Sequence, residues 1–261
     1  MAINTALLNK ICTTPGAPGF EKEIRALVLK EIKGLVDEVE IDNMGNVYAI
    51  KRGTGDKRVM IGAHMDEIGF MVTHIDDNGF IRFHTLGGFD PKTLTAQRVI
   101  IHGKKDIIGV MASKPIHVMT ADERNKVAKL SDYFIDTGLS AEEVNEIVTI
   151  GDSITREREF IEMGNCVNGK SLDNRLAVFI LIEMFRGLVG KTVPYDIYGV
   201  FTVQEEVGIR GANVSSMRIN PDFGFGLDTT IAFDLPGAAA HEKITELGKG
   251  TAIKIMDAST I

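Results

Sequence analysis

An interruption in the rhythm of helices and strands constrains the fold of this chain more than any other feature. Residues Glu21 to Leu35 place apolar side chains at helical spacing, and the apolar strand Arg58 to Ala63 follows. From about Gly69 to Cys166 the pattern changes to short strands joined by turn signals such as Asp77-Asn78-Gly79. After Gly169 helices and strands alternate again. The sequence therefore predicts an α/β domain built from residues 1–67 and 168–261, interrupted by a β-rich insertion at residues 68–167.

Individual elements can be assigned within this frame. The run Val59-Met60-Ile61-Gly62-Ala63 predicts a strand buried on both faces. Ser140-Ala141-Glu142-Glu143 is a capping box that opens a short helix. The further expected elements are strands at Val39 to Ile41 and Val47 to Lys51, hairpins in FMVTHI/FIRFHTL and RVIIHG/DIIGVMAS, a helix from Asp173 to Leu188, a strand from Tyr195 to Val203, a helix starting near Gly211 and a strand from Phe223 to Leu227.

Composition excludes several classes of function. The 261 residues hold 29 Lys and Arg against 36 Asp and Glu, a net charge of −7, which gives no electrostatic footprint for nucleic acid. The longest apolar run, Leu176 to Phe185, is broken by Glu183 and falls short of the ~20 residues that cross a bilayer. The N-terminus has no secretory pattern, and the two cysteines, Cys12 and Cys166, are expected to be reduced thiols. We therefore expect a cytoplasmic protein with no nucleic-acid or membrane partner.

Imidazole and carboxylate side chains gather where the predicted α/β elements end or begin. His64-Met65-Asp66-Glu67 follows the buried strand. Glu205-Glu206 follows the expected strand Tyr195 to Val203, and Asp228 follows the last expected strand. Asp173 lies at the start of a helix. Each of these residues alone could have a purely structural role, as a structural histidine, a helix cap or a solvated pair of glutamates. Open α/β sheets bind ligands at the carboxyl ends of their strands, so together these residues predict a site for zinc, cobalt or manganese.

Four motifs that carry these residues resemble one known family. HMDEIGFMV, SLDNR, TVQEEVGIRGA and GLDTTIAFDLPG are similar to motifs of the cytosolic co-catalytic metallo-aminopeptidases, which include glutamyl, deblocking and tetrahedral, dodecameric aminopeptidases. The resemblance runs over essentially the whole chain. It implies a zinc-peptidase-like α/β sandwich as the catalytic domain, interrupted by a β-rich domain that helps to build dimers.

The resemblance also implies ligands for two divalent metal ions. His64 matches the imidazole ligand of the first metal, Asp173 matches the carboxylate that bridges both metals, and Asp228 completes the first site. Glu206 matches a ligand of the second metal. Zinc or cobalt is the expected metal, with manganese as an alternative.

Two further residues match positions next to the metals in this family. Glu205 matches the general base that takes a proton from water, and Asp66 matches a residue that orients the histidine ligand. Two cations about 3.5–4 Å apart can clamp the attacking and leaving groups of a hydrolysis.

The second metal site is expected to be incomplete in this chain. The family takes a further histidine from a segment near its C-terminus, and this chain ends at Ile261 before any such segment. His241 is the weak candidate for a substitute, and the other histidines match no ligand motif. On this basis we expect one tightly bound ion, a second ion only at high metal concentration, and a chain that lacks the family's C-terminal segment.

Three functions remain open at this point. The leading one is a metal-dependent aminopeptidase that removes N-terminal residues from peptides and assembles as a homo-oligomer. A glycoside hydrolase of the endoglucanase type would also use paired carboxylates, but the absence of Trp and the presence of only 4 Tyr argue against sugar stacking. A catalytically inactive scaffold or assembly subunit of the same family is the third.

Overall fold

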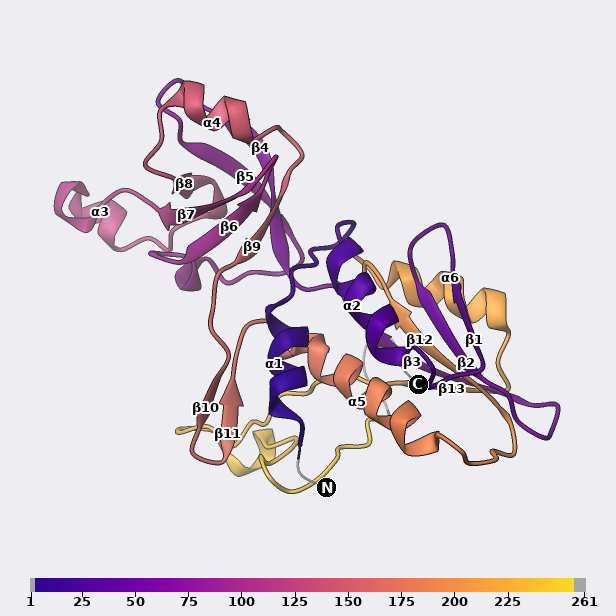
Figure 1. The fold of residues 1–261 in the computed structure, drawn as a ribbon. Helices are drawn as coiled ribbons and strands as arrows, with labels where there is room; N and C mark the ends of the chain where they lie inside the picture. Colours follow the sequence, from indigo (N-terminus) through magenta and orange to yellow (C-terminus); the bar gives the residue numbers. More distant parts are fainter. Residues whose placement is uncertain (1–2, 256–261) are drawn as a thin grey trace.

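The computed structural model describes residues 3–255, which form a five-stranded sheet layered with helices and a separate closed barrel (Figure 1). The expectation that this chain lacks the family's C-terminal segment concerns Ile261, which lies outside the described residues. Within residues 3–255, no helix combines the length and the apolar composition that a bilayer crossing requires.

The five-stranded sheet brings the ends of three parallel strands to one edge. Its order is β1-β2-β12-β3-β13, in which β3 pairs in parallel with β12 on one side and with β13 on the other. In register, His64 lies opposite Thr202, and Gly62 lies opposite Gly226. The strands are β1 (Glu38–Ile41), β2 (Val47–Lys51), β3 (Arg58–His64), β12 (Asp196–Thr202) and β13 (Phe223–Gly226).

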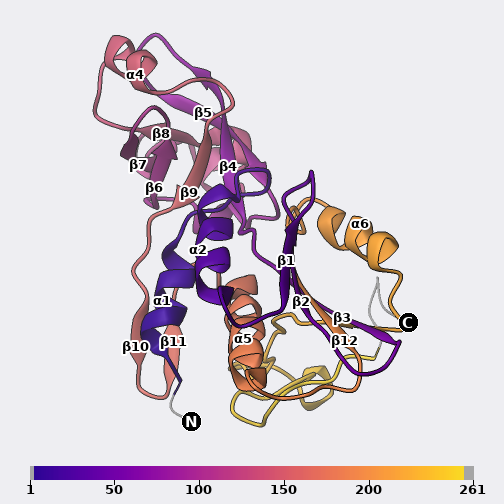
Figure 2. The ribbon, with the colours of Figure 1, turned by 45° about the vertical axis from the view of Figure 1, so that its right-hand side comes forward.

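Helices cover both faces of this sheet (Figure 2). The alternation of a strand is visible in β2, where Val47 and Ala49 belong to one core and Tyr48 and Ile50 to the other. The first core packs against α1, α2 and α5, and the second packs against α6 through Ile219. The helices are α1 (Thr5–Thr13), α2 (Lys22–Ile32), α5 (Leu172–Leu188) and α6 (Arg210–Ile219).

The hairpin-rich middle of the chain closes into a six-stranded barrel in the order β4-β5-β8-β7-β6-β9. Its interior holds apolar side chains such as Phe70, Ile101 and Ile154, which are fully buried. Strands β10 and β11 form a two-stranded sheet outside the barrel. The elements are β4 (Gly69–Ile75), β5 (Ile81–Leu86), β6 (Arg98–His102), β7 (Asp106–Ala112), α3 (Ala121–Arg124), β8 (Phe134–Asp136), α4 (Ala141–Ile147), β9 (Ser153–Arg156), β10 (Ile161–Met163) and β11 (Cys166–Asn168), with 3-10 turns at Pro91–Thr93, Ile116–Val118, Leu130–Asp132 and Ala240–Glu242.

The structure differs from the predicted elements at α1, at the end of α2 and at the start of α5, and α3 and the strands β8 to β11 were not predicted. No helix is predicted at Thr5–Thr13, although Asn4 caps this helix by accepting a hydrogen bond from the Leu7 N–H. The second helix ends at Ile32 rather than Leu35, because Gly34 takes a left-handed φ of 77° that stops the helix. Asp173 and Asn174 lie within α5 but have non-helical backbone angles, so the regular helix starts after them. The Asp173–Asn174 peptide bond is cis.

Close packing between α5 and the central strand β12 yields a test of the fold. A Cβ atom at Gly199 would lie 2.4 Å from the Phe185 ring and 3.2 Å from Leu181, whereas a Cβ atom at Gly224 in β13 would meet no atom within 4 Å. We expect Gly199→Ala to lower the free energy of unfolding by about 1–3 kcal/mol through overpacking. The matched variant Gly224→Ala should change it by less than about 0.5 kcal/mol. Urea unfolding measures both, and equal losses would contradict this packing.

Candidate metal centre

Three strand ends and one helix start bring the predicted ligands to the same edge of the sheet. His64 is the last residue of β3, Glu205 and Glu206 follow β12, and Asp228 lies two residues beyond the end of β13. Asp173 reaches the same edge from the start of α5. Because β3, β12 and β13 are parallel, their carboxyl ends coincide, and the side chains converge.

His64, Asp173 and Asp228 form a cluster that could hold a metal ion. Each offers one ligand atom, and these atoms lie within 4.8 Å of one another. The His64 Nε2 atom is 3.1 Å from Asp173 Oδ1. His64 is buried while both aspartates are exposed, so the cluster has a fixed base and an open side. One imidazole and two carboxylates are a donor set that suits zinc and related ions.

The two glutamates lie beside this cluster rather than within it. Glu205 Oε2 is 3.7 Å from His64 Nε2, and both Glu205 and Glu206 are half-buried. Among residues 3–255, no second group of three such ligands is present, and His241 belongs to no group of this kind.

Asp66 fixes the turn that carries both glutamates. Its side chain is fully buried, and its two oxygens accept the backbone N–H groups of Glu205 at 3.0 Å and Glu206 at 3.1 Å. Its Oδ1 also lies 3.4 Å from His64 Nδ1, which is longer than a well-formed hydrogen bond. The predicted role of Asp66 in orienting His64 stays a prediction, and the hydrogen bonds to the glutamate turn are a further role that the sequence did not indicate.

Burial and neighbouring charges shift the pKa values of these groups. Burial raises the pKa of Glu206 to about 7, with the nearby carboxylates of Asp173, Asp66 and Glu205 adding to the rise. Burial and the neighbouring carboxylates also raise the pKa values of Glu205 and Asp228.

The same carboxylates also raise the pKa of His64, although burial acts on it in the opposite direction. Burial lowers its pKa, but the carboxylates of Asp173, Asp66 and Glu205 outweigh this effect and raise it to about 10. Several carboxylates thus face a single imidazole, and a divalent cation would relieve their repulsion. The residues present therefore fit a metal ion.

Sequence reasoning missed the buried residues that support this edge. Glu67, Lys170 and Arg175 form a buried charged group within or next in sequence to the predicted motifs. Glu21, also buried, accepts N–H groups from Gly19 at 2.8 Å and from Gln204 at 3.2 Å. The sequence feature that could have identified Glu67 and Lys170 is their position in or next to the motifs. Glu67 ends His64-Met65-Asp66-Glu67, and Lys170 directly precedes SLDNR.

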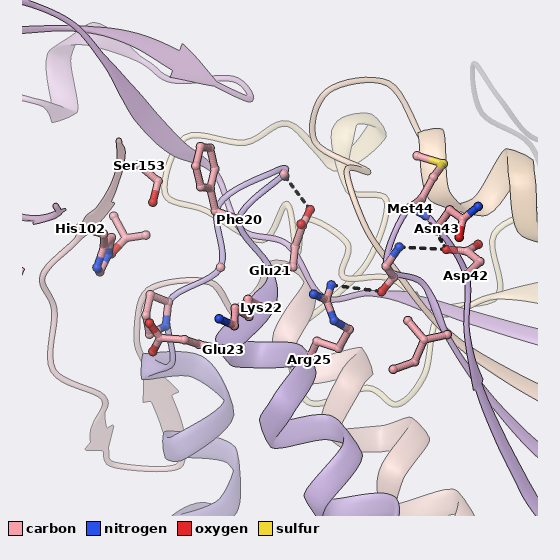
Figure 3. A pocket seen from close by; sticks show the side chains of 16 residues that line it. Phe20, Glu21, Lys22, Glu23, Arg25, Asp42, Asn43, Met44, His102 and Ser153 are labelled. Carbon is pink, nitrogen blue, oxygen red and sulfur yellow. Dashed lines mark hydrogen bonds between the residues drawn. The ribbon is translucent and has the colours of Figure 1, made fainter. Parts of the chain in front are cut away.

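A cavity of about 540 Å³ lies between the start of α2, the turn after β1 and the barrel (Figure 3). Glu21, Arg25 and Asp42 line one side, and His102 and Ser153 line the barrel side. None of the predicted metal or catalytic residues lines it. This cavity is therefore separate from the candidate metal centre.

Comparison with known proteins agrees with this geometry. Residues 45–261 match the model of the M42 glutamyl aminopeptidase family. The lysyl aminopeptidase of Pyrococcus furiosus is 36% identical over 265 residues, which cover 97% of this chain and 73% of that protein.

Solved structures show the same fold. The TET aminopeptidase of a marine-sediment Thaumarchaeota archaeon superposes with a TM-score of 0.91 at 38% identity, covering 94% of this chain and 70% of that chain. The TET1 peptidase of Pyrococcus horikoshii, which can assemble into a tetrahedron or a large octahedral shell, gives a TM-score of 0.80 at 32% identity, covering 88% of this chain and 72% of that chain. The sequence motifs, the fold and these similarities together establish that the chain belongs to the M42 glutamyl aminopeptidase family.

Proposed function

We propose that this protein is a metal-dependent aminopeptidase that removes N-terminal residues from peptides. The observation that carries the proposal is the cluster of His64, Asp173 and Asp228, with the Glu205 carboxylate 3.7 Å from the same imidazole. A proton acceptor beside a metal site is what hydrolysis of an amide bond requires, and the nearness of Glu205 to this cluster supports the proposal.

Each side chain has a proposed role in this reaction. His64, Asp173 and Asp228 would hold the first divalent ion, while Asp173 and Glu206 would contribute to a second. The bound ions would polarise the scissile carbonyl and lower the pKa of water. Zinc or cobalt is the proposed metal and manganese the alternative, because nitrogen and oxygen donors accept all three.

Glu205 is the proposed general base. Burial raises the pKa of Glu205 toward neutral pH. A group with a pKa nearer the working pH is better able to take a proton from water and to return it to the leaving amine. Asp66 supports this role because it holds the Glu205 and Glu206 backbone N–H groups and so fixes where both carboxylates can reach.

The two alternative functions have less support. The matched family model and the relatives described above are aminopeptidases, which does not favour a glycoside hydrolase. An inactive scaffold would have no need to collect an imidazole and several carboxylates at one sheet edge, because their repulsion destabilises the metal-free fold.

The paired glutamates provide the test of this function. With added Co²⁺, the protein should release the N-terminal residue of an aminoacyl amide and should leave a soluble glucan intact. Glu205→Gln should lower kcat by about 10²–10⁴ without changing metal content, because only the proton acceptor is lost. Glu206→Gln, the matched neighbour, should reduce the amount of bound metal. Glucan hydrolysis, or equal metal loss in both variants, would contradict the assignment.

Metal affinity should rise with pH. The pKa of about 10 at His64 means that the metal-free imidazole is protonated at pH 6–8, and Glu206, near 7, is partly protonated. A ligand must give up its proton to bind a metal, so raising the pH removes a competitor. We expect the Co²⁺ association constant to increase about tenfold per pH unit or more between pH 6 and 8. Calorimetry in two buffers of different ionisation enthalpy counts the released protons; a pH-independent affinity with no proton release would refute this.

We further propose that the barrel contributes to a homo-oligomer. Apolar side chains on β7 and the segment after it are exposed, including Ile108, Val110, Ile116 and Val118. A second copy of this chain is the proposed cover, since the similar TET1 peptidase assembles into closed shells. The assembly is proposed to be built from dimers, with a dodecamer as a candidate form.

Charge placed on this surface tests the proposed interface. The double variant Ile116→Asp and Val118→Asp should give a smaller assembly by light scattering, because it buries two carboxylates in an apolar contact. Met217→Asp, at a side chain that is 80% exposed on α6, is the control for added charge elsewhere. An unchanged mass for the double variant would argue against this interface.

A cytoplasmic location is also proposed. Both cysteines are free, Cys12 buried in the core and Cys166 exposed, as expected in a reducing compartment. Fractionation of cells that produce the protein checks this, and recovery outside the cytoplasm would contradict it.

A further inference from the structure

Glu67 occupies an unusual place for a carboxylate. Its side chain is fully buried, directly after Asp66 in the chain, and its backbone N–H donates to the Gly16 carbonyl at 3.0 Å. A buried carboxylate costs several kcal/mol unless cations and hydrogen bonds compensate it. The identity of its partners therefore determines what this residue does.

The partners of Glu67 come from the segment that carries Asp173. Lys170 Nζ contacts both Glu67 oxygens, at 2.6 and 2.7 Å, and is itself buried. The Ser171 hydroxyl donates to Glu67 Oε2. Ser171, two residues before Asp173, has a left-handed φ of 64°. Residues other than glycine rarely adopt this backbone conformation. The contacts with Glu67 thus hold an unfavourable turn immediately before a proposed ligand.

A second cation completes the group. Arg175 is fully buried, with Nη2 3.7 Å from Glu67 Oε1, and its Nη1 donates to the carbonyls of Ile11 at 2.6 Å and Thr14 at 2.7 Å. Glu67 therefore faces two positive charges, and Arg175 remains as its counter-ion if the charge of Lys170 is removed.

The neighbouring residues Asp66 and Glu67 act on different segments. Asp66 accepts the N–H groups of Glu205 and Glu206, whereas Glu67 binds Lys170 and Ser171 ahead of Asp173. His64 lies two and three residues before them on the same strand end. One short stretch of chain thus contacts two of the three other segments that carry proposed functional carboxylates, those of Asp173 and of Glu205 and Glu206.

We propose that Glu67 and Lys170 are a positioning pair, which fixes the turn before Asp173 so that its carboxylate meets His64 at the metal site. The inference rests on the proposed function, because it assigns a role toward the same metal ion. Removing one partner of a buried ion pair lowers stability whatever else the pair does. A role toward Asp173 must therefore appear in metal binding as well as in stability.

Lys170→Met tests the proposal, because it removes one charge at similar length and leaves Glu67 paired with Arg175. We expect the Co²⁺ affinity, measured by calorimetry, to fall about 10–100-fold, as for other groups that support metal ligands. The visible absorption of bound Co²⁺ should also change, because it reports the coordination geometry. Thermal unfolding of the metal-free protein is measured alongside.

Arg186→Met is the matched control. Arg186 pairs with Glu31 at 2.6 Å and joins the same helix α5 to α2, away from the metal site. It should leave Co²⁺ affinity within about twofold and the spectrum unchanged, whatever its effect on unfolding. If Lys170→Met does not fold, Ser171→Ala decides, with an expected loss of at least about threefold from one missing hydrogen bond.

The outcomes separate the two proposals. Wild-type affinity and spectrum in Lys170→Met would overturn the positioning role, as would affinity losses in both variants that follow only their losses in stability. In either case, Co²⁺ binding and peptidase activity of the wild-type protein would leave the proposed function standing. Failure of the wild-type protein to bind Co²⁺ would overturn both.

Discussion

Electrostatic repulsion at one edge of the sheet is the constraint on which the rest of this structure depends. Asp173, Glu205, Glu206 and Asp228 converge there on a single imidazole, His64, and the pKa values of three of these carboxylates are raised by burial and by one another. Such an arrangement is unfavourable in the metal-free protein and becomes favourable with a divalent cation. The fold supplies it because three parallel strands end side by side.

The strand end at residues 64–67 organises this edge. His64 faces the proposed metal, Asp66 holds the turn of Glu205 and Glu206, and Glu67 holds the turn before Asp173. Both of those turns contain a residue other than glycine with positive φ, Gln204 at 54° and Ser171 at 64°. The two buried carboxylates offset that unfavourable backbone by binding N–H and O–H groups, which ties local structure to the position of the reactive side chains.

The sequence predicted the parts of this account that depend on local pattern. Periodicity and turn chemistry predicted most helices, the strands β1 to β7, β12 and β13, and the β-rich middle, whereas the short strands β8 to β11 were not predicted. The position of His64 and Glu205 after apolar strands indicated a common edge. The helix at Thr5–Thr13 was not predicted, although the shorter helix α4 was, because α4 opens with a capping box and Thr5–Thr13 does not. The role of Glu67 was not predicted because its partner Lys170 is 103 residues away in the chain. A carboxylate beside a strand end has the same sequence pattern whether it is solvated or paired. Asp66 was predicted beside the site, but its hydrogen bonds to the glutamate turn required the tertiary structure.

Anomalous X-ray diffraction from crystals grown with Co²⁺ tests the central claim most directly, because it locates the ion without reference to activity. The account predicts a strong anomalous peak for a Co²⁺ ion within bonding distance of His64 Nε2 and of the carboxylates of Asp173 and Asp228. An ion bound elsewhere, such as in the cavity lined by Glu21 and Asp42, with no peak at His64, would contradict it.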